Sequence, residues 1–339
     1  MSNRRFRSLF INTSLSLIVL ILALIVGITA VEFHDGIDFT ESRGWHDPNT
    51  QFDSELGWSP IASRHLQVSW GDITTNSLGF RSKEIDPNKK QIAILGDSVA
   101  WGFKVGDHEH VGFHLEQLVE RFGINVQNLG VSGYGLDQSY LNLKRHLNDF
   151  NHLVTIVLII YTNNDFYDTR SNGKSAKRKP LFVIEEGKLK LTNVPIHKFC
   201  LRNLITKSYA LRRLISNSKI DRLLSPVIGD QSLKESEAME VVRLLLHEME
   251  RLAQSRGANF LIVLSPNKND FGKKSNELNR FEQLISQEHL VSINFFDVIK
   301  KEIDSNREIK LNDIFIDSAH LSSAGNQLLA ETIFKTIQP

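Results

Sequence analysis

Residues 91–102 read QIAILGDSVAWG, and this stretch decides the fold expected for the chain. Its first part, Gln91–Leu95, is a short, continuous apolar run with β-branched residues. Such a run is typical of a strand that is covered on both faces. It leads directly into Gly96-Asp97-Ser98, a composition that is common in turns. The stretch therefore predicts a buried strand that ends in a tight turn carrying a serine.

The same kind of apolar run returns four times along the chain, and amphipathic stretches lie between the runs. The further runs are Ile124–Leu129, Leu153–Tyr161, Asn259–Leu264 and Val291–Phe296. The helical stretches are residues 108–122, 136–149, 233–256, 276–288 and 323–336. Strands that alternate with helices imply right-handed crossovers and a parallel sheet. We therefore predict an α/β fold with three layers, in which reactive residues gather at the carboxyl ends of the strands.

The composition is that of an ordinary globular protein. Of the 339 residues, 41% are hydrophobic and 23% are charged, and this length suits one large domain or two modest ones. The formal net charge of +1 gives no indication of nucleic-acid binding. Cys200 is the single cysteine, so no internal disulfide can form.

Residues 9–31 form a continuous apolar stretch without a charged residue. A helix of this length rises about 1.5 Å per residue and crosses a hydrocarbon core of roughly 30 Å. Three arginines in residues 1–8 precede the stretch, which places that terminus in the cytoplasm and everything after residue 31 outside. We therefore expect a single-pass anchor in the cytoplasmic membrane, with the rest of the chain on the extracytoplasmic (periplasmic or extracellular) side. A cleaved signal peptide is the alternative, although Ile28-Thr29-Ala30 is a poor cleavage site.

Two further segments depart from the strand–helix pattern. Residues 32–90 have no long helical period and predict a stalk and a small irregular or β-rich lead-in to the main domain, residues 91–339. Residues 166–232 interrupt that domain with a basic insertion, which contains a hairpin turning at Glu186-Gly187. Its lysines and arginines are either simply solvated or form a positively charged surface for an anionic substrate or for membrane headgroups. Replacing Lys177, Arg178 and Lys179 by Gln should distinguish these alternatives.

Three polar segments follow the first three predicted strands. Ser98 follows the first, where its hydroxyl projects from the sheet edge and its backbone N–H is free to bind an oxyanion. Asn128–Gly133 follows the second, and its glycines let a backbone N–H approach a substrate. Asn163-Asn164-Asp165 follows the third and offers a side-chain amide that can donate to an oxyanion. Taken singly, each is also an ordinary turn composition.

A fourth segment, Asp317-Ser318-Ala319-His320, precedes the last predicted helix. A catalytic histidine needs a carboxylate to fix its tautomer, and three residues' separation within one loop can supply that contact. Ser322 is expected to cap the helix and so to hold the loop still. The three histidines between residues 108 and 114 have no comparable neighbour and are expected to be solvated. No His or acidic residues show a convincing metal-ligand spacing.

In this order, the four segments resemble the four sequence blocks of the SGNH/GDSL hydrolase family, over roughly residues 91–337. The resemblance implies a flavodoxin-like fold with Ser98 as nucleophile and Asp317 and His320 completing a triad. It also implies an oxyanion hole made by Ser98, Gly133 and Asn164. Thr162 stands where the third block of the family, GxND, has glycine. The segment NSLGFRS, residues 76–82, further resembles a lead-in seen in membrane-anchored bacterial members of this family.

The function that the resemblance implies is acyl transfer through a covalent intermediate, without a metal or another cofactor. We expect a serine-dependent ester hydrolase that acts outside the cytoplasmic membrane on an O-acylated small molecule, glycan or lipid, such as an O-acetyl polysaccharide. An O-acyltransferase that modifies an envelope or exported polysaccharide has the same triad and is the first alternative. A non-catalytic envelope assembly or binding protein is the second. The sequence names no protein partner.

Overall fold

The computed structural model describes residues 49–174, 177–196, 231–306 and 308–338, together with five single positions between residues 16 and 27. The predicted anchor, residues 9–31, otherwise lies outside these ranges, and so does the part of the basic insertion from residue 197 to 230. Within the part that is described, no helix combines the length and the apolar character needed to span a membrane. Pro48–Lys174, Lys179–Ile196 and Gln231–Pro339 form one compact unit, which holds every element named below except the short strand β9 (Lys177–Arg178).

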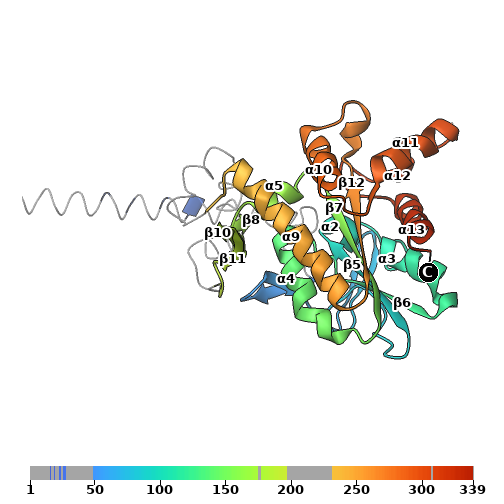
Figure 1. Ribbon diagram of the computed structural model, residues 1–339, viewed down its shortest axis with the longest axis horizontal. Coiled ribbons are helices and arrows are strands. Elements are labelled where there is room, and N and C mark those ends of the chain that lie inside the picture. Colours follow the sequence, from blue (N-terminus) through green and yellow to red (C-terminus); the bar gives the residue numbers. More distant parts are fainter. Residues whose placement is uncertain are drawn as a thin grey trace, which may run out of the picture. The chain divides into compact units, whose positions relative to one another are not determined.

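A five-stranded parallel sheet lies at the centre of this unit (Figure 1). Its strands in chain order are β5 (Lys90–Gly96), β6 (Ile124–Asn128), β7 (Leu153–Tyr161), β12 (Asn259–Ser265) and β13 (Ser292–Asn294). Their order across the sheet is β13-β12-β7-β5-β6, which is the flavodoxin-like order 2-1-3-4-5. The predicted α/β fold with a parallel sheet is confirmed. The residues that follow β5, β6 and β7 come from three adjacent strand ends.

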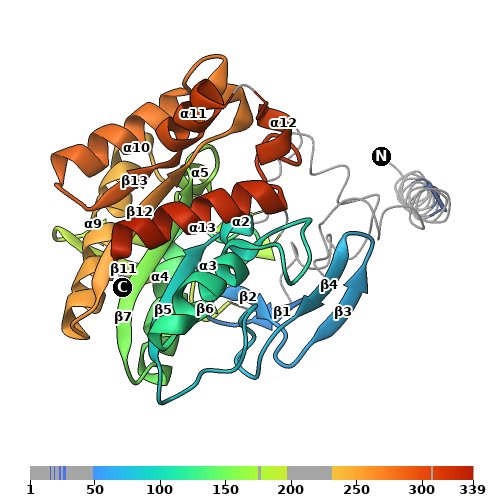
Figure 2. The ribbon, with the colours of Figure 1, turned by 90° about the vertical axis from the view of Figure 1, so that its right-hand side faces the viewer.

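Helices cover both faces of the sheet (Figures 1 and 2). One face is covered by α4 (Leu136–His146), α9 (Glu235–Ser255) and α10 (Asn276–Gln287). The other is covered by α3 (Val111–Val119), α11 (Phe295–Ser305) and α13 (Ser323–Ile337). In α9 the buried residues Ala238, Val241, Val242, Leu245 and Met249 recur at helical spacing, because only one stripe of the helix faces the core. The remaining short helices are α2 (Ser98–Trp101), η1 (Glu120–Phe122), η2 (Leu147–Asp149), α5 (Asp165–Thr169), η3 (Lys268–Phe271) and α12 (Leu311–Ile314).

The last predicted strand is wrong at its carboxyl end. The strand stops at Asn294, and Phe295 and Phe296 form the first turn of α11. The side chain of Asn294 accepts a hydrogen bond from the backbone N–H of Phe296 at 3.2 Å, which is the contact of a helix N-cap. Both phenylalanines are buried in the helix, so an apolar run could not distinguish the two structures.

Two antiparallel hairpins precede the sheet in the chain (Figure 2). They are β1 (Thr50–Asp53) with β2 (Gly57–Pro60), and β3 (His65–Val68) with β4 (Gly71–Thr74). From residue 49 onward this lead-in belongs to the same compact unit as the sheet. Leu56 is fully buried in its core. The carboxylate of Asp53 accepts hydrogen bonds from both terminal nitrogens of Arg145 on α4, which fastens the first hairpin to that helix.

The hairpin predicted inside the basic insertion is confirmed. It pairs β10 (Leu181–Glu185) with β11 (Lys188–Thr192), after the short strand β8 (Gly173–Lys174). Its two turn residues, Glu186 and Gly187, have φ of 51° and 74°, as a two-residue turn of this kind requires. The expectation that the basic residues around it are exposed is wrong for Lys179. Its ammonium is fully buried against the carboxylate of Asp137 on α4.

Candidate active site

Ser98 is the first residue of α2, and only Asp97 separates it from the end of β5. Asp97 caps this helix, since its carboxylate accepts a hydrogen bond from the backbone N–H of Val99 at 2.8 Å. The turn depends on Gly96, whose φ is +144°. A Cβ at this position would lie 2.4 Å from the carbonyl oxygen of Ile159 on the neighbouring strand. Glycine therefore lets the chain leave the sheet sharply and present the serine at the strand end.

Asp317 and His320 lie in the loop between α12 and α13. The backbone N–H of Ile316 donates to the carbonyl of His320 at 2.9 Å, so the loop is closed by its own hydrogen bond. Ser322 accepts a hydrogen bond from Gly325 N–H at 3.1 Å and is the N-cap of α13, as predicted. The backbone N–H of Lys268 donates to the carbonyl of Ser318 at 2.8 Å, which fixes the tip of the loop to η3.

The structure brings Ser98, His320 and Asp317 into one hydrogen-bonded chain. His320 Nε2 lies 2.9 Å from Ser98 Oγ, although the two residues are 222 positions apart. His320 Nδ1 lies 3.0 Å from each carboxylate oxygen of Asp317. A carboxylate can only accept, so Nδ1 carries the proton and Nε2 is left to accept from the serine hydroxyl. This arrangement can remove a proton from Ser98 when its oxygen attacks an electrophile.

Asp317 is held as a carboxylate. Burial alone would raise its pKa, but hydrogen bonds from the His320 side chain and from two backbone N–H groups reverse that effect. Those N–H groups belong to Ala319 and His320 and lie 2.9 Å from Oδ1. The pKa of Asp317 is therefore well below its usual range. A permanent negative charge at this place stabilises the imidazolium that forms when His320 accepts a proton.

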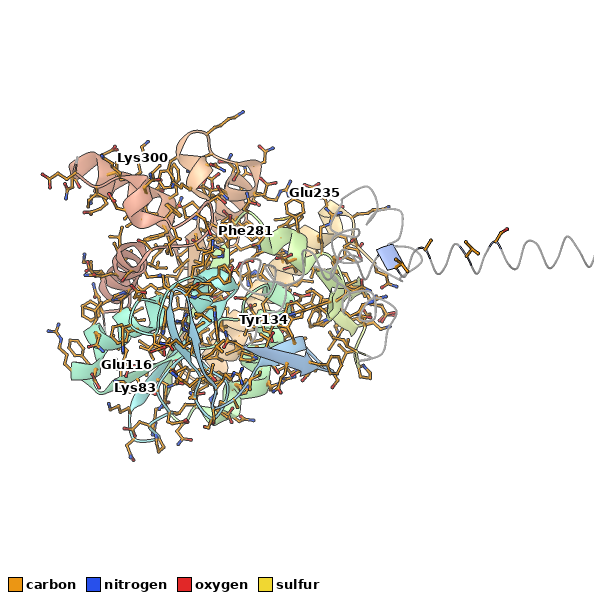
Figure 3. All side chains as sticks on the ribbon, turned by 180° about the vertical axis from the view of Figure 1, so that it is seen from behind. Lys83, Glu116, Tyr134, Glu235, Phe281 and Lys300 are labelled. Atoms are coloured by element: carbon orange, nitrogen blue, oxygen red, sulfur yellow. The ribbon has the colours of Figure 1, made fainter. Side chains whose placement is uncertain are left out.

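The three residues predicted for the oxyanion hole follow the ends of β5, β6 and β7. Gly133 lies in a turn with φ of +82°, a conformation that a side chain would strain. That turn is braced by the first hairpin. Trp58 Nε1 donates to the carbonyl of Ser132 at 3.1 Å. The hydroxyl of Tyr134, a residue labelled in Figure 3, donates to the carbonyl of Trp58 at 2.6 Å. Among the described residues, the N–H groups of Ser98 and Gly133 donate to no backbone carbonyl outside the regular hydrogen bonds of helices and strands.

Asn164 is the third of these residues and precedes α5. Its side-chain carbonyl oxygen is buried and has no hydrogen-bond partner in the described part of the chain. Thr162 occupies the position that is glycine in the GxND block, and the backbone here does not need a glycine. Thr162 is fully buried, and its N–H donates to the carbonyl of Ser265 at 3.1 Å, which continues the pairing of β7 with β12. A β-branched residue suits such an extension of a strand.

Sequence reasoning missed two contacts to the His–Asp pair and misjudged one histidine. Lys104 Nζ lies 3.0 Å from Asp317 Oδ2, and the ring of Phe103 lies 4.7 Å from the imidazole of His320. No signal in the sequence points to a contact between residues 213 positions apart.

His110 was expected to be solvated but is buried, and it caps α3 by accepting from Phe113 N–H at 3.2 Å. Burial lowers the pKa of His110 well below its ordinary value, so this ring is neutral.

Within the residues that the structure describes, no group of three or more His, Cys, Asp or Glu side chains is placed to hold a metal ion. The chemistry open to the arrangement is that of a serine hydroxyl activated by a histidine that a carboxylate orients.

Comparisons with known proteins found similar solved structures. One is a member of the lipolytic protein G-D-S-L family from Veillonella parvula, with 13% identity, coverage of 74% of this chain and 98% of that one, and a TM-score of 0.41. Another is an acetylxylan esterase from Geobacillus stearothermophilus, with 12% identity, coverage of 74% and 96%, and a TM-score of 0.40. A third is an α/β hydrolase enzyme from the metagenome of Lake Arreo in Spain, with 9% identity, coverage of 74% and 95%, and a TM-score of 0.43. No protein-family model matches the chain, and a search of curated proteins found no match.

Proposed function

We propose that this chain is a serine esterase of the SGNH/GDSL type, with Ser98, His320 and Asp317 as its catalytic triad. The observation that carries the proposal is the continuous hydrogen-bonded chain from Ser98 Oγ through His320 to the Asp317 carboxylate. It lies at the carboxyl edge of a parallel sheet, where α/β enzymes bind their ligands. The order of the four sequence blocks supports the same assignment.

The mechanism follows from the roles that these groups can take. His320 accepts the hydroxyl proton of Ser98 while Ser98 Oγ forms a bond to the ester carbonyl carbon. The carbonyl oxygen gains negative charge, and the N–H groups of Ser98 and Gly133 and the amide of Asn164 stabilise it. When the ester C–O bond breaks, the imidazolium returns its proton to the leaving alcohol. Water then attacks the acyl-serine with His320 as base again, which releases the acid and restores Ser98.

For the substrate we propose an O-acyl ester on a glycan or a lipid outside the cytoplasmic membrane. The uncharged, arginine-flanked stretch of residues 9–31 supports this location. A reporter enzyme that is active only after export, fused after residue 339, should be active. The protein should also stay with the membrane fraction after a carbonate wash. A shortened and freely soluble product would instead indicate a cleaved signal peptide.

The catalytic proposal is tested with the purified chain and p-nitrophenyl esters of short and long acids, beside acetylated glycans. Ser98→Ala should lower kcat by about 10³-fold or more without changing the circular-dichroism spectrum. Ser305→Ala is the matched control, since this exposed serine at the end of α11 donates its hydroxyl proton to the carbonyl of Glu302 in its own helix at 3.0 Å. Normal turnover by Ser98→Ala would show that Ser98 is not the nucleophile. If an added sugar captures the acyl group in preference to water, the chain is an acyltransferase.

A further inference from the structure

The segment NSLGFRS, residues 76–82, has no place in the proposed mechanism, yet it is tied to the loop that follows β6. Asn76 shapes the segment, since its side-chain oxygen accepts from the N–H of Phe80 at 2.9 Å. Ser82 Oγ accepts from the N–H of Asn128 at 2.6 Å, and the N–H of Arg81 donates to the carbonyl of the same residue at 3.2 Å. The segment is therefore fixed against the last residue of β6.

From this position Arg81 reaches the loop that follows the nucleophile helix. Its guanidinium is buried and donates to the carbonyls of Trp101 at 3.0 Å, Gly102 at 2.7 Å and Val105 at 2.7 Å. Its Nε lies 3.4 Å from the carboxylate of Asp107. Burying a guanidinium is unfavourable unless its donors are satisfied. The carbonyl of the last residue of α2 and two carbonyls of the loop that follows accept from it here, so Arg81 fixes the shape of that loop.

That loop carries Phe103 and Lys104 onto the His–Asp pair. Lys104 has φ of +65°, an uncommon conformation for a residue with a side chain, and such residues concentrate at functional sites. It places Nζ 3.0 Å from Asp317 Oδ2, with 40% of the lysine side chain exposed. The centroid of the Phe103 ring lies 4.7 Å from that of His320 and 5.9 Å from that of Trp70. Both members of the pair are thus contacted by adjacent residues of one loop.

The charged groups near the pair come from the start of α2, from η3 and from the loop after α2. Asp97 at the start of α2 and Asp270 in η3 are acidic, and both interact electrostatically with the phenol of Tyr161 at the end of β7. Lys268 in η3 directs its ammonium to the side chain of Asn312. Lys104 is the cation that contacts Asp317 directly. The positive charge of Lys104 therefore opposes the negative charges near His320, which gains and loses a proton during the reaction.

We propose that Arg81 and Lys104 are positioning residues for the triad. Arg81 fixes the loop, and Lys104, carried by that loop, orients the Asp317 carboxylate and sets the charge beside His320. The inference rests on the proposed function. It also gives the segment NSLGFRS a role, because this segment connects the end of β6 to the loop after α2.

The test measures the reactivity of Ser98 with a fluorophosphonate probe, which needs no knowledge of the natural substrate. The rate of labelling of the full chain is followed from pH 5 to 9, and mass spectrometry identifies the labelled residue. If the wild type is not labelled at Ser98, the proposed function fails, whatever the variants do. If it is labelled, the Lys104 variants decide the inference.

For Lys104→Met we expect two changes. Loss of the contact to Asp317 should lower the labelling rate on the plateau of the pH profile several-fold. Loss of the cation should let His320 take up its proton more readily. The acid limb of the pH profile, where labelling slows as the pH falls, should therefore move to higher pH by about half a unit. This movement should shrink in 1 M salt, because a half-exposed charge is screened. Lys104→Arg keeps the cation and should keep the acid limb of the wild type.

The matched control is Lys83→Met, because Lys83 is a surface lysine that pairs with Glu116 at 3.7 Å and with Glu120 at 3.4 Å (Figure 3). It should leave both plateau and limb unchanged. Arg81→Lys keeps a charge but loses the fork that reaches three carbonyls, so the plateau should fall about 10- to 100-fold. An acid limb of Lys104→Met that coincides with that of the wild type overturns the inference, even if the plateau falls, because a merely structural role predicts that result.

Discussion

The buried pair of Lys179 and Asp137 offers the sharpest test of the energetics of this fold. Both side chains are fully buried. The ammonium of Lys179 donates to the Asp137 carboxylate. It also donates to the carbonyl of Ser171 at 3.1 Å and to that of Pro180 at 3.1 Å. The other carboxylate oxygen of Asp137 accepts from the N–H of Gln138 at 2.9 Å. All three ammonium protons thus have an acceptor, and the pair joins the insertion to the first turn of α4.

Removing one member leaves the other charge buried without its partner. Lys179→Met should therefore lower the free energy of unfolding by about 3–5 kcal/mol. The double variant Lys179→Met/Asp137→Asn leaves no charge behind, so its loss should be smaller than that of Lys179→Met alone, which a double-mutant cycle quantifies. Lys190→Met is the matched control. Lys190 lies on the same hairpin, is 53% exposed and pairs with Glu185, so its loss should cost about 0–1 kcal/mol.

The pH dependence of Lys179→Met provides a second signature. Burial raises the pKa of Asp137, and the attraction of Lys179 opposes that rise. Without Lys179 the carboxyl group binds a proton more readily in the folded chain than in the unfolded one. The variant should then be closest to the wild type at acid pH and should fall behind as the pH rises.

The assay is guanidinium unfolding at pH 5 and pH 8, followed by tryptophan fluorescence. Trp58 and Trp101 are buried and report the loss of the core. A Lys179→Met variant that loses less than about 1 kcal/mol at pH 8 would refute the reasoning, because that cost is typical of an exposed pair.

Three further predictions concern the oxyanion site, the first hairpin and the basic insertion. Asn164→Ala removes one oxyanion donor, so kcat should fall about 10²–10³-fold in steady-state ester hydrolysis, and an unchanged kcat would exclude Asn164 from the site. Burial alone would raise the pKa of Asp53, but hydrogen bonds led by that from Arg145 lower it to about 2 from an ordinary value of 3.8. The stability that this group contributes is present above pH 4 and is lost as the pH falls toward 2. Acid titration should therefore show a loss in the wild type about 1–2 kcal/mol greater than in Asp53→Asn, and equal losses would contradict the assignment. Changing Lys177 and Arg178 together to Gln, with the buried Lys179 left intact, tests whether their charge attracts an anionic substrate. A KM raised for anionic esters alone would support this role, and equal KM values would exclude it.

The sequence by itself determined the local structure of this protein. Continuous apolar runs such as Leu153–Tyr161 predicted buried parallel strands, and the helical spacing in residues 233–256 predicted α9, because burial on two faces or on one stripe imposes those periods. The turn at Glu186-Gly187 was equally readable, since Gly187 adopts positive φ without strain. The residues proposed for catalysis were found through the resemblance of four ordered sequence blocks to the SGNH/GDSL family. Each block taken singly has the composition of an ordinary turn.

Only the tertiary structure decided which distant groups meet. The strand order, the burial of Lys179 against Asp137, and the contact of Lys104 with Asp317 have no local signature. A lysine has the same sequence pattern whether it is solvated or paired in the core, because its environment is set by elements far away in the chain. The helix at Phe295 shows the same limit at short range, since a capping side chain outweighed an apolar run that suited a strand equally well. Local periodicity indicates which side chains of a segment are buried. The packing of the whole chain determines which residues those side chains contact.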